Sequence, residues 1–131
     1  MQSSPTGDEY TASIPSGEGD IPTFITKPEG DGPFPCVIFF MDIFGPREEL
    51  YQMCRRFASK GYLTVLPHLF YRDGSFACHP TQRSESEMQR ALELNISTTN
   101  QMVASDTESI IDFLDIEESA DSARVGTIGT C

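Results

Sequence analysis

The sequence predicts an α/β fold, a mostly parallel sheet with helices on both faces. Two observations lead to this prediction. An unbroken apolar run at residues 36–41 is followed by an amphipathic helix pattern and a second apolar run, all within about 30 residues, which is the length of a strand–helix–strand unit. Two further helical patterns and a β-prone segment at residues 124–131 come next. Strands that alternate with helices in this way form sheets covered on both sides.

Two strands are expected before this unit. Residues 9–14 and 20–26 are β-prone, and the Pro and Gly residues between them predict a turn. Together they predict an antiparallel pair, in which Pro22 favours an edge position. We expect residues 1–8 to form a flexible tail, which leaves residues 9–131 as the N-terminal part of a single domain.

The central unit has the clearest pattern. Residues 36–41 include no polar residue, which is typical of a strand buried on both faces. The helix after it places an apolar face at Leu50, Met53, Cys54, Phe57 and Ala58. Gly61 can end this helix, and residues 62–66 form the next strand.

The later elements are less regular. Residues 68–80 predict an irregular, aromatic segment, and residues 81–94 a short helix with a capping box at Ser84 and Glu87. A second capping box, Thr98 with Gln101, is expected to open a longer helix that ends near Ile116. An acidic loop at residues 117–122 then leads to the terminal strand.

Composition narrows the classes of partner. Nine basic and 20 acidic residues give a net charge of −11, which disfavours nucleic acids and anionic membrane surfaces. No apolar run approaches the roughly 20 residues of a membrane-spanning helix, and the first residues lack a signal-peptide pattern. Four cysteines at irregular spacing, with Cys36 and Cys54 in apolar patterns, predict buried thiols in a reducing cytoplasm. Cys78 and the two histidines match no metal-ligand spacing, so we expect no metal.

Two strand ends carry the candidate chemistry. Asp42 and Ile43 follow the first buried strand, and Cys131 ends the last strand after Gly129 and Thr130. Working groups of α/β sheets collect at the carboxyl ends of strands, so a thiol and a carboxylate would face one another if these strands are neighbours. The Ile43 N–H could then serve as an oxyanion donor. The alternatives are that Asp42 is a turn residue and Cys131 an ordinary thiol.

Three blocks resemble the dienelactone hydrolase family, which is carboxymethylenebutenolidase-like and part of the α/β-hydrolase superfamily. They are residues 39–50, 59–67 and 125–131, and the similarity covers about residues 10–131. The resemblance implies an α/β-hydrolase-like sheet truncated after the nucleophile strand, a Cys-His-Asp triad, and no metal or organic cofactor. It implies hydrolysis of a lactone or ester; the type member of the family opens the enol-lactone ring of dienelactone.

The resemblance also assigns roles. Cys131 matches the nucleophile, Ile43 the first oxyanion donor, and Asp42 an acidic position that is Glu in the type member. The triad Asp and His follow the nucleophile in the family, so we expect the chain to be an N-terminal portion that is inactive alone. His68 and His79 lie in the wrong segment to replace them.

The substrate-binding residues stay open, since arginines that hold the substrate carboxylate in the type member have no clear match. Arg83 and Arg90 are nearby candidates. The expected partner is a small lactone or ester, with no nucleic acid and no membrane; the oligomeric state stays open. Two functions are considered: part of such a hydrolase, or a non-catalytic truncated α/β module that pairs with a partner through its open sheet edge.

Overall fold

The computed structural model describes residues 6–129. Its strands form a mixed sheet in the order β1-β2-β4-β3-β5. The bounds are Thr6–Ser16 for β1, Gly19–Pro28 for β2, Phe34–Phe40 for β3, Leu63–Pro67 for β4 and Ala120–Gly129 for β5. β3 is parallel to β4 and β5, whereas β2 is antiparallel to β1 and β4. The predicted parallel arrangement of the last three strands and the antiparallel opening pair are both confirmed. The edge position expected from Pro22 is wrong, because β2 lies between β1 and β4.

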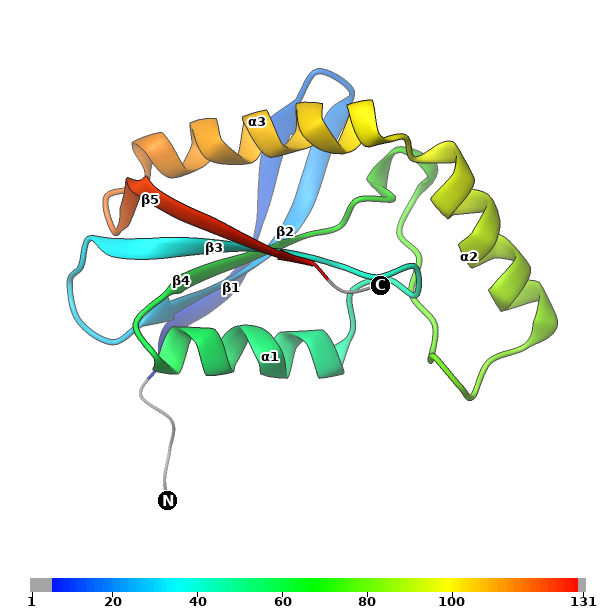
Figure 1. Cartoon of the computed structure of the whole chain (residues 1–131), viewed down its shortest axis with the longest axis horizontal. Coiled ribbons are helices and arrows are strands. Elements are labelled where there is room, and N and C mark those ends of the chain that lie inside the picture. The colour runs from blue at the N-terminus through cyan, green and yellow to red at the C-terminus, as the bar shows by residue number, and fades with distance from the viewer. Residues whose placement is uncertain (1–5, 130–131) are drawn as a thin grey trace.

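Helices lie on both faces of this sheet, as predicted. α1 (Glu48–Ser59) covers one face and α3 (Asn100–Ile116) the other (Figure 1). α2 (Glu85–Ser97) lies beyond the end of the sheet and leads into α3, and a 3-10 turn, η1 (Tyr71–Asp73), follows β4.

The core consists of two apolar layers, one on each face of the sheet. The layer next to α3 contains Ile38, Val65, Ile110 and Leu114 among its fully buried members. The opposite layer joins Phe39 and Leu66 to the helix face of α1, where Leu50, Cys54 and Ala58 are buried. β3 and β4 are therefore buried on both sides, because successive side chains enter different layers.

Several boundaries differ from the prediction. β1 begins at Thr6 rather than Glu9, so residues 6–8 lie in a strand and not in the expected tail. β5 begins at Ala120, inside the expected acidic loop. Its pairing with β3 shifts between Pro35, which lies opposite Asp121, and Cys36, which lies opposite Val125.

The two capping boxes had different outcomes. The Ser84 box is confirmed: its Oγ accepts the Glu87 N–H at 3.1 Å and the Glu87 carboxylate accepts the Ser84 N–H at 2.8 Å. The second box was placed one residue too early. The Thr98 N–H still donates to the Leu94 carbonyl at 3.0 Å and ends α2, so Thr99 becomes the N-cap of α3 and accepts the Met102 N–H at 3.1 Å.

Candidate active site

The predicted meeting of strand ends is the first feature of the site. β3 and β5 are neighbours, and Phe40 lies opposite Gly129 in their register. Asp42 and Ile43 therefore lie just beyond the carboxyl end of β3, at the same end of the sheet as the carboxyl end of β5. Cys131 lies outside the described residues, so its distance to Asp42 stays a prediction.

Asp42 is held by a tight local turn. Its Oδ1 accepts the Phe44 N–H at 3.0 Å, and Arg47 binds both carboxylate oxygens, at 2.8 Å and 2.9 Å. Both side chains are largely buried, with 10% of Asp42 and 16% of Arg47 exposed. The hydrogen bonding of Arg47 to the Asp42 carboxylate raises the pKa of Arg47. The carboxylate thus helps to form the turn, and its predicted role beside the thiol stays a prediction.

Sequence reasoning missed Arg47. The signal was present, because the arginine is only five residues from Asp42 and an intervening Gly allows the chain to fold back. Arg47 also donates to the Gly45 carbonyl at 3.0 Å, so its guanidinium links the first residue of the turn, Asp42, to a carbonyl later in the turn.

The same turn is braced by the loop after η1. The Cys78 N–H donates to the Phe44 carbonyl at 2.9 Å. Gly45 has φ +84°, and a Cβ added there would lie 2.1 Å from the Phe76 carbonyl oxygen. Only glycine fits this position without moving backbone. The orientation of the Ile43 N–H is therefore set by contacts on both sides of the turn.

A pocket of about 330 Å³ opens beside this turn. It is lined by Met41, Asp42, Ile43, Leu69, Phe70, Asn95, Thr98, Asn100 and Val103. These residues come from the ends of β3 and β4 and from the junction of α2 with α3. Of the residues expected at the site, Asp42 and Ile43 line the pocket, whereas Arg83 and Arg90 do not. Between residues 6 and 129, no atom accepts a hydrogen bond from the Ile43 N–H.

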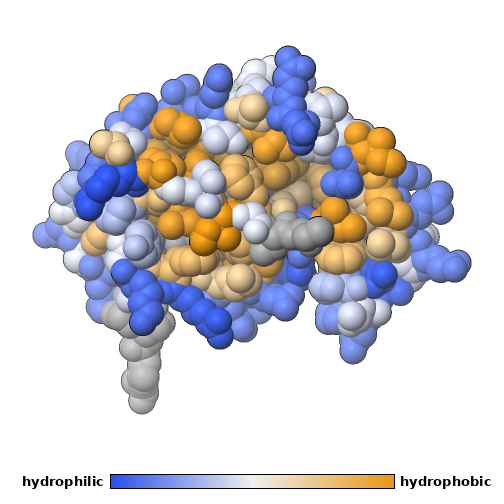
Figure 2. Space-filling model, viewed as in Figure 1, coloured by the Kyte–Doolittle hydropathy of each residue, from blue (hydrophilic) through white to orange (hydrophobic). Residues whose placement is uncertain are grey.

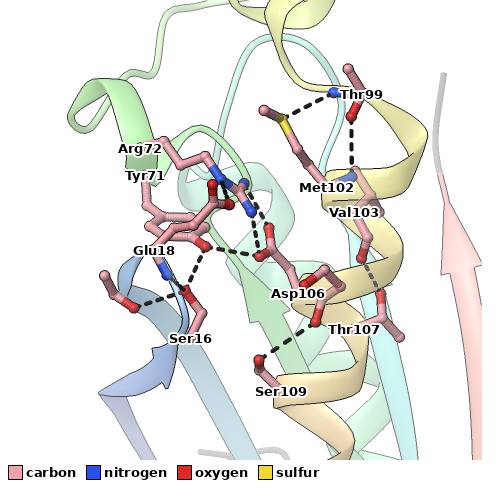
Figure 3. A network of polar contacts seen from close by, with 12 residues as sticks. Ser16, Glu18, Tyr71, Arg72, Thr99, Met102, Val103, Asp106, Thr107 and Ser109 are labelled. Atoms are coloured by element: carbon pink, nitrogen blue, oxygen red, sulfur yellow. Dashed lines mark hydrogen bonds and ion pairs between the residues drawn. The ribbon is translucent and has the colours of Figure 1, made fainter.

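A buried polar network fixes two walls of the pocket relative to each other (Figure 3). Asp106 of α3 is fully buried and is bound by both terminal nitrogens of Arg72, at 3.0 Å and 2.8 Å. The Tyr71 hydroxyl donates to Asp106 at 2.8 Å and is within 2.7 Å of the Ser16 hydroxyl. Because Tyr71 and Arg72 follow the wall residue Phe70, the network joins that wall to α3. No short-range pattern pointed to it.

Neither histidine lines the pocket. His68 is buried, and its Nε2 accepts the Phe76 N–H at 3.2 Å; burial lowers its pKa. The Nδ1 of His79 accepts the backbone N–H groups of Thr81 and Gln82, at 3.0 Å and 2.8 Å. Over residues 6–129, no group of three or more His, Cys, Asp or Glu side chains could hold a metal ion.

The face of the molecule along the β5 edge carries hydrophobic side chains. Figure 2 shows hydrophobic side chains along the middle of the face between α3 and α1, where the β5 edge of the sheet lies. Ile128 of β5 and Ile111 of α3 are among the exposed large hydrophobic residues. None of the helices found between residues 6 and 129 is long and apolar enough to cross a membrane.

Comparisons with known proteins agree with this geometry. A sequence model described as "Dienelactone hydrolase family" matches residues 21–131. A carboxymethylenebutenolidase homologue of Methylorubrum extorquens is 31% identical over 118 residues, which are 90% of this chain and 39% of that protein.

Solved structures show the same similarity. The crystal structure of a dienelactone hydrolase homologue from Klebsiella pneumoniae superposes with a TM-score of 0.80 at 28% identity, covering 95% of this chain and 50% of that one. The dienelactone hydrolase of Anabaena variabilis shares the fold, with a TM-score of 0.64 at 17% identity, over 96% of this chain and 52% of that one. The chain thus spans between 39% and 52% of the length of these relatives. It belongs to the dienelactone hydrolase family.

Proposed function

We propose that this chain supplies the nucleophile and the first oxyanion donor of a hydrolase that cleaves lactone or ester bonds. The observation that carries the proposal is the braced turn at the end of β3. Ile43 of this turn lines the pocket, and its N–H has no acceptor among the described residues; the neighbouring strand β5 leads to Cys131. Family membership supports the same chemistry.

In the proposed reaction, the Cys131 thiolate attacks the substrate carbonyl carbon, and the electron pair of the C=O bond moves to the oxygen. The Ile43 N–H would stabilise the oxyanion that forms. Collapse of the tetrahedral intermediate expels the alkoxide, which in a lactone remains attached to the acyl group. Hydrolysis of the acyl-enzyme by water returns the thiol.

Asp42 is proposed to act through the turn. Arg47 engages both oxygens of its carboxylate, and one of them also accepts the Phe44 N–H, so a role in orienting Ile43 fits better than proton transfer. Direct contact between Asp42 and the thiol stays a prediction. A second oxyanion donor and the base that activates water are expected from residues later in the protein, since the family places its triad Asp and His there.

The other cysteines are poor competitors for acylation. Burial raises the pKa of Cys36 to about 11 and that of Cys54 to about 12, so both remain thiols at neutral pH. Cys78 is also buried, and burial raises its pKa. These three free, buried thiols fit the reducing cytoplasm that we expect for the protein.

The test is the reaction of the purified chain with p-nitrophenyl acetate. We expect release of a single equivalent of p-nitrophenol without sustained turnover, and an acetyl group on Cys131 by mass spectrometry. Cys131→Ser should abolish the burst. Gly45→Ala should slow it about tenfold or more, because the added Cβ displaces the donor.

Gly61→Ala is the matched control. Gly61 also has a positive φ, +98°, but no atom lies within 4 Å of an added Cβ, so the burst rate should stay within about twofold of wild type. Acetylation at another residue would contradict the proposal. So would equal burst rates in Gly45→Ala and wild type.

A second candidate function is favoured by the outer edge of β5. Within the described residues β5 pairs with β3 alone, and most residues between Arg124 and Gly129 are exposed. An unpaired edge of this kind can add a strand from a partner. For a non-catalytic module we expect concentration-dependent association by light scattering that Thr127→Lys abolishes, together with no acetylation of Cys131.

A further inference from the structure

Among the residues that the structure describes, none with a positive charge lines the pocket beside Ile43. Its nine lining residues include neither Lys nor Arg, and Asp42 is the one charged side chain among them. An anionic substrate group placed here would meet no free cation among these residues, because the nearby Arg47 guanidinium is bound to the Asp42 carboxylate. This composition bears on which lactone or ester the site would accept.

The arginines around the site are engaged elsewhere. Arg47 binds Asp42 and Glu49, and Arg72 binds Asp106 and Glu18.

Arg83 donates to the Pro80 carbonyl and lies 5.4 Å from the centre of the Phe44 ring. Arg90 pairs with Glu93 on the exposed side of α2. The two arginines that the sequence offered for a substrate carboxylate therefore point to other partners.

Neutral polar groups take the place of cations. Asn95, Thr98 and Asn100 line the pocket from the α2–α3 junction, and within the described part of the chain their side chains make no hydrogen bonds. Amide and hydroxyl groups both donate and accept, so they suit carbonyl, ether and hydroxyl oxygens. The remaining wall, Leu69, Phe70 and Val103 among others, is apolar.

We propose that this pocket takes an uncharged acyl group, so that neutral lactones and esters bind in preference to those that carry a carboxylate. The inference rests on the proposed function and names its substrate class. The net charge of −11 acts in the same direction, because it repels anions from the whole surface. A volume of about 330 Å³ lies near the lower end of small-molecule pockets, which favours a short acyl chain.

A matched pair of ligands tests the inference without turnover. Methyl 5-oxotetrahydrofuran-3-carboxylate is neutral, and the corresponding free acid is an anion of the same ring at pH 7. We would titrate each into the ¹⁵N-labelled chain and follow the amide signals of Ile43, Leu69 and Val103. The neutral ester should bind at least about tenfold more tightly, with shifts centred on these residues.

Variants that add a charge at different places separate the effect of the pocket lining from the effect of the protein's net charge. Asn100→Lys places a cation in the lining and should move the preference toward the acid by about tenfold or more, whereas Asn100→Gln should not. Gln52→Lys adds the same charge at an exposed position of α1 that does not line the pocket. The ratio of the two ligand affinities should then stay within about twofold of the wild-type ratio.

The outcomes distinguish the two proposals. Tighter binding of the acid at these amides would overturn the uncharged-substrate inference and leave the hydrolase proposal standing. If neither ligand shifts these amides, the pocket is not a lactone site, and the hydrolase proposal falls with the inference. An unchanged preference in Asn100→Lys would also overturn the inference, because the lining would then not decide the charge of the ligand.

Discussion

Two arginine–aspartate pairs illustrate different uses of the same interaction. Arg47 and Asp42 are five residues apart and close one turn at the pocket, whereas Arg72 and Asp106 are 34 residues apart and join η1 to α3. In both pairs the guanidinium binds both carboxylate oxygens. Asp42 retains 10% exposure and Asp106 retains none.

The difference lies in what must fold first. The turn at Asp42 can form as soon as its own residues meet, so its arginine mainly orients Ile43. The Arg72–Asp106 pair exists only once the β1–β2 turn, η1 and α3 have assembled around it (Figure 3). We therefore expect the first pair to control the site and the second to control the stability of the domain.

The largest expected effect comes from Asp106→Ala. It leaves the Arg72 guanidinium, 14% exposed, without its buried partner, and breaking such a pair costs about 3–5 kcal/mol. The free energy of unfolding from urea denaturation measures this loss. Glu93→Ala, which removes an exposed pair within α2, should cost less than about 1 kcal/mol. Similar losses in the two variants would show that burial does not set the value of these pairs.

Arg47→Met should have an intermediate effect on stability and a larger one on the site. Asp42 keeps its hydrogen bond from Phe44 and some contact with water at the pocket, so we expect a cost of about 1–2 kcal/mol. Hydrogen exchange should accelerate at the Ile43 and Phe44 amides more than in β4. If exchange accelerates uniformly instead, the Arg47–Asp42 pair stabilises the whole domain and does not act mainly on the turn. The contrast with the Arg72–Asp106 pair would then be wrong.

The smallest effect is expected at a third pair, in which Arg55 of α1 binds both carboxylate oxygens of Glu9 in β1. The hydrogen bond from Arg55 lowers the pKa of Glu9 below 4.5. A carboxyl whose pKa is lowered by folding stabilises the protein above its unfolded-state pKa and loses that contribution as the pH falls through its folded-state pKa.

Because this pair is partly exposed, Glu9→Gln should lower stability by less than about 1 kcal/mol at pH 7. The difference from wild type should shrink as the pH falls below 4.5, as followed by urea denaturation at several pH values. A difference that grows on acidification would contradict the assigned direction.

The sequence predicted those parts of the fold that depend on neighbours in the chain. The apolar run at residues 36–41 became β3, and the helix pattern from Leu50 to Ala58 became α1 with its expected buried face. The Ser84 box was predicted correctly because both of its hydrogen bonds close within one turn. Asp42 and Ile43 were placed at the pocket because they directly follow a strand.

The rest depends on contacts that no local pattern records. Asp106 lies at a position where any helix could carry a solvent-facing carboxylate, and only the packing of η1 against α3 buries it. The wall formed by Asn95 and Asn100 depends on the angle between α2 and α3. The error at Thr98 has a similar origin, since a threonine pair offers two equivalent caps and the end of α2 decides between them.

The backbone at Gly45 has a consequence for how this chain can change over time. The Phe76 carbonyl occupies the space that any side chain would need, so purifying selection there acts on volume and not on reactivity. A library randomised at position 45 and selected for an intact pocket should return almost only glycine, whereas position 61, where φ is also positive but no atom crowds an added Cβ, should favour glycine less strictly. Because the clash is with backbone, a chain that no longer uses the nucleophile would still be restricted to glycine here.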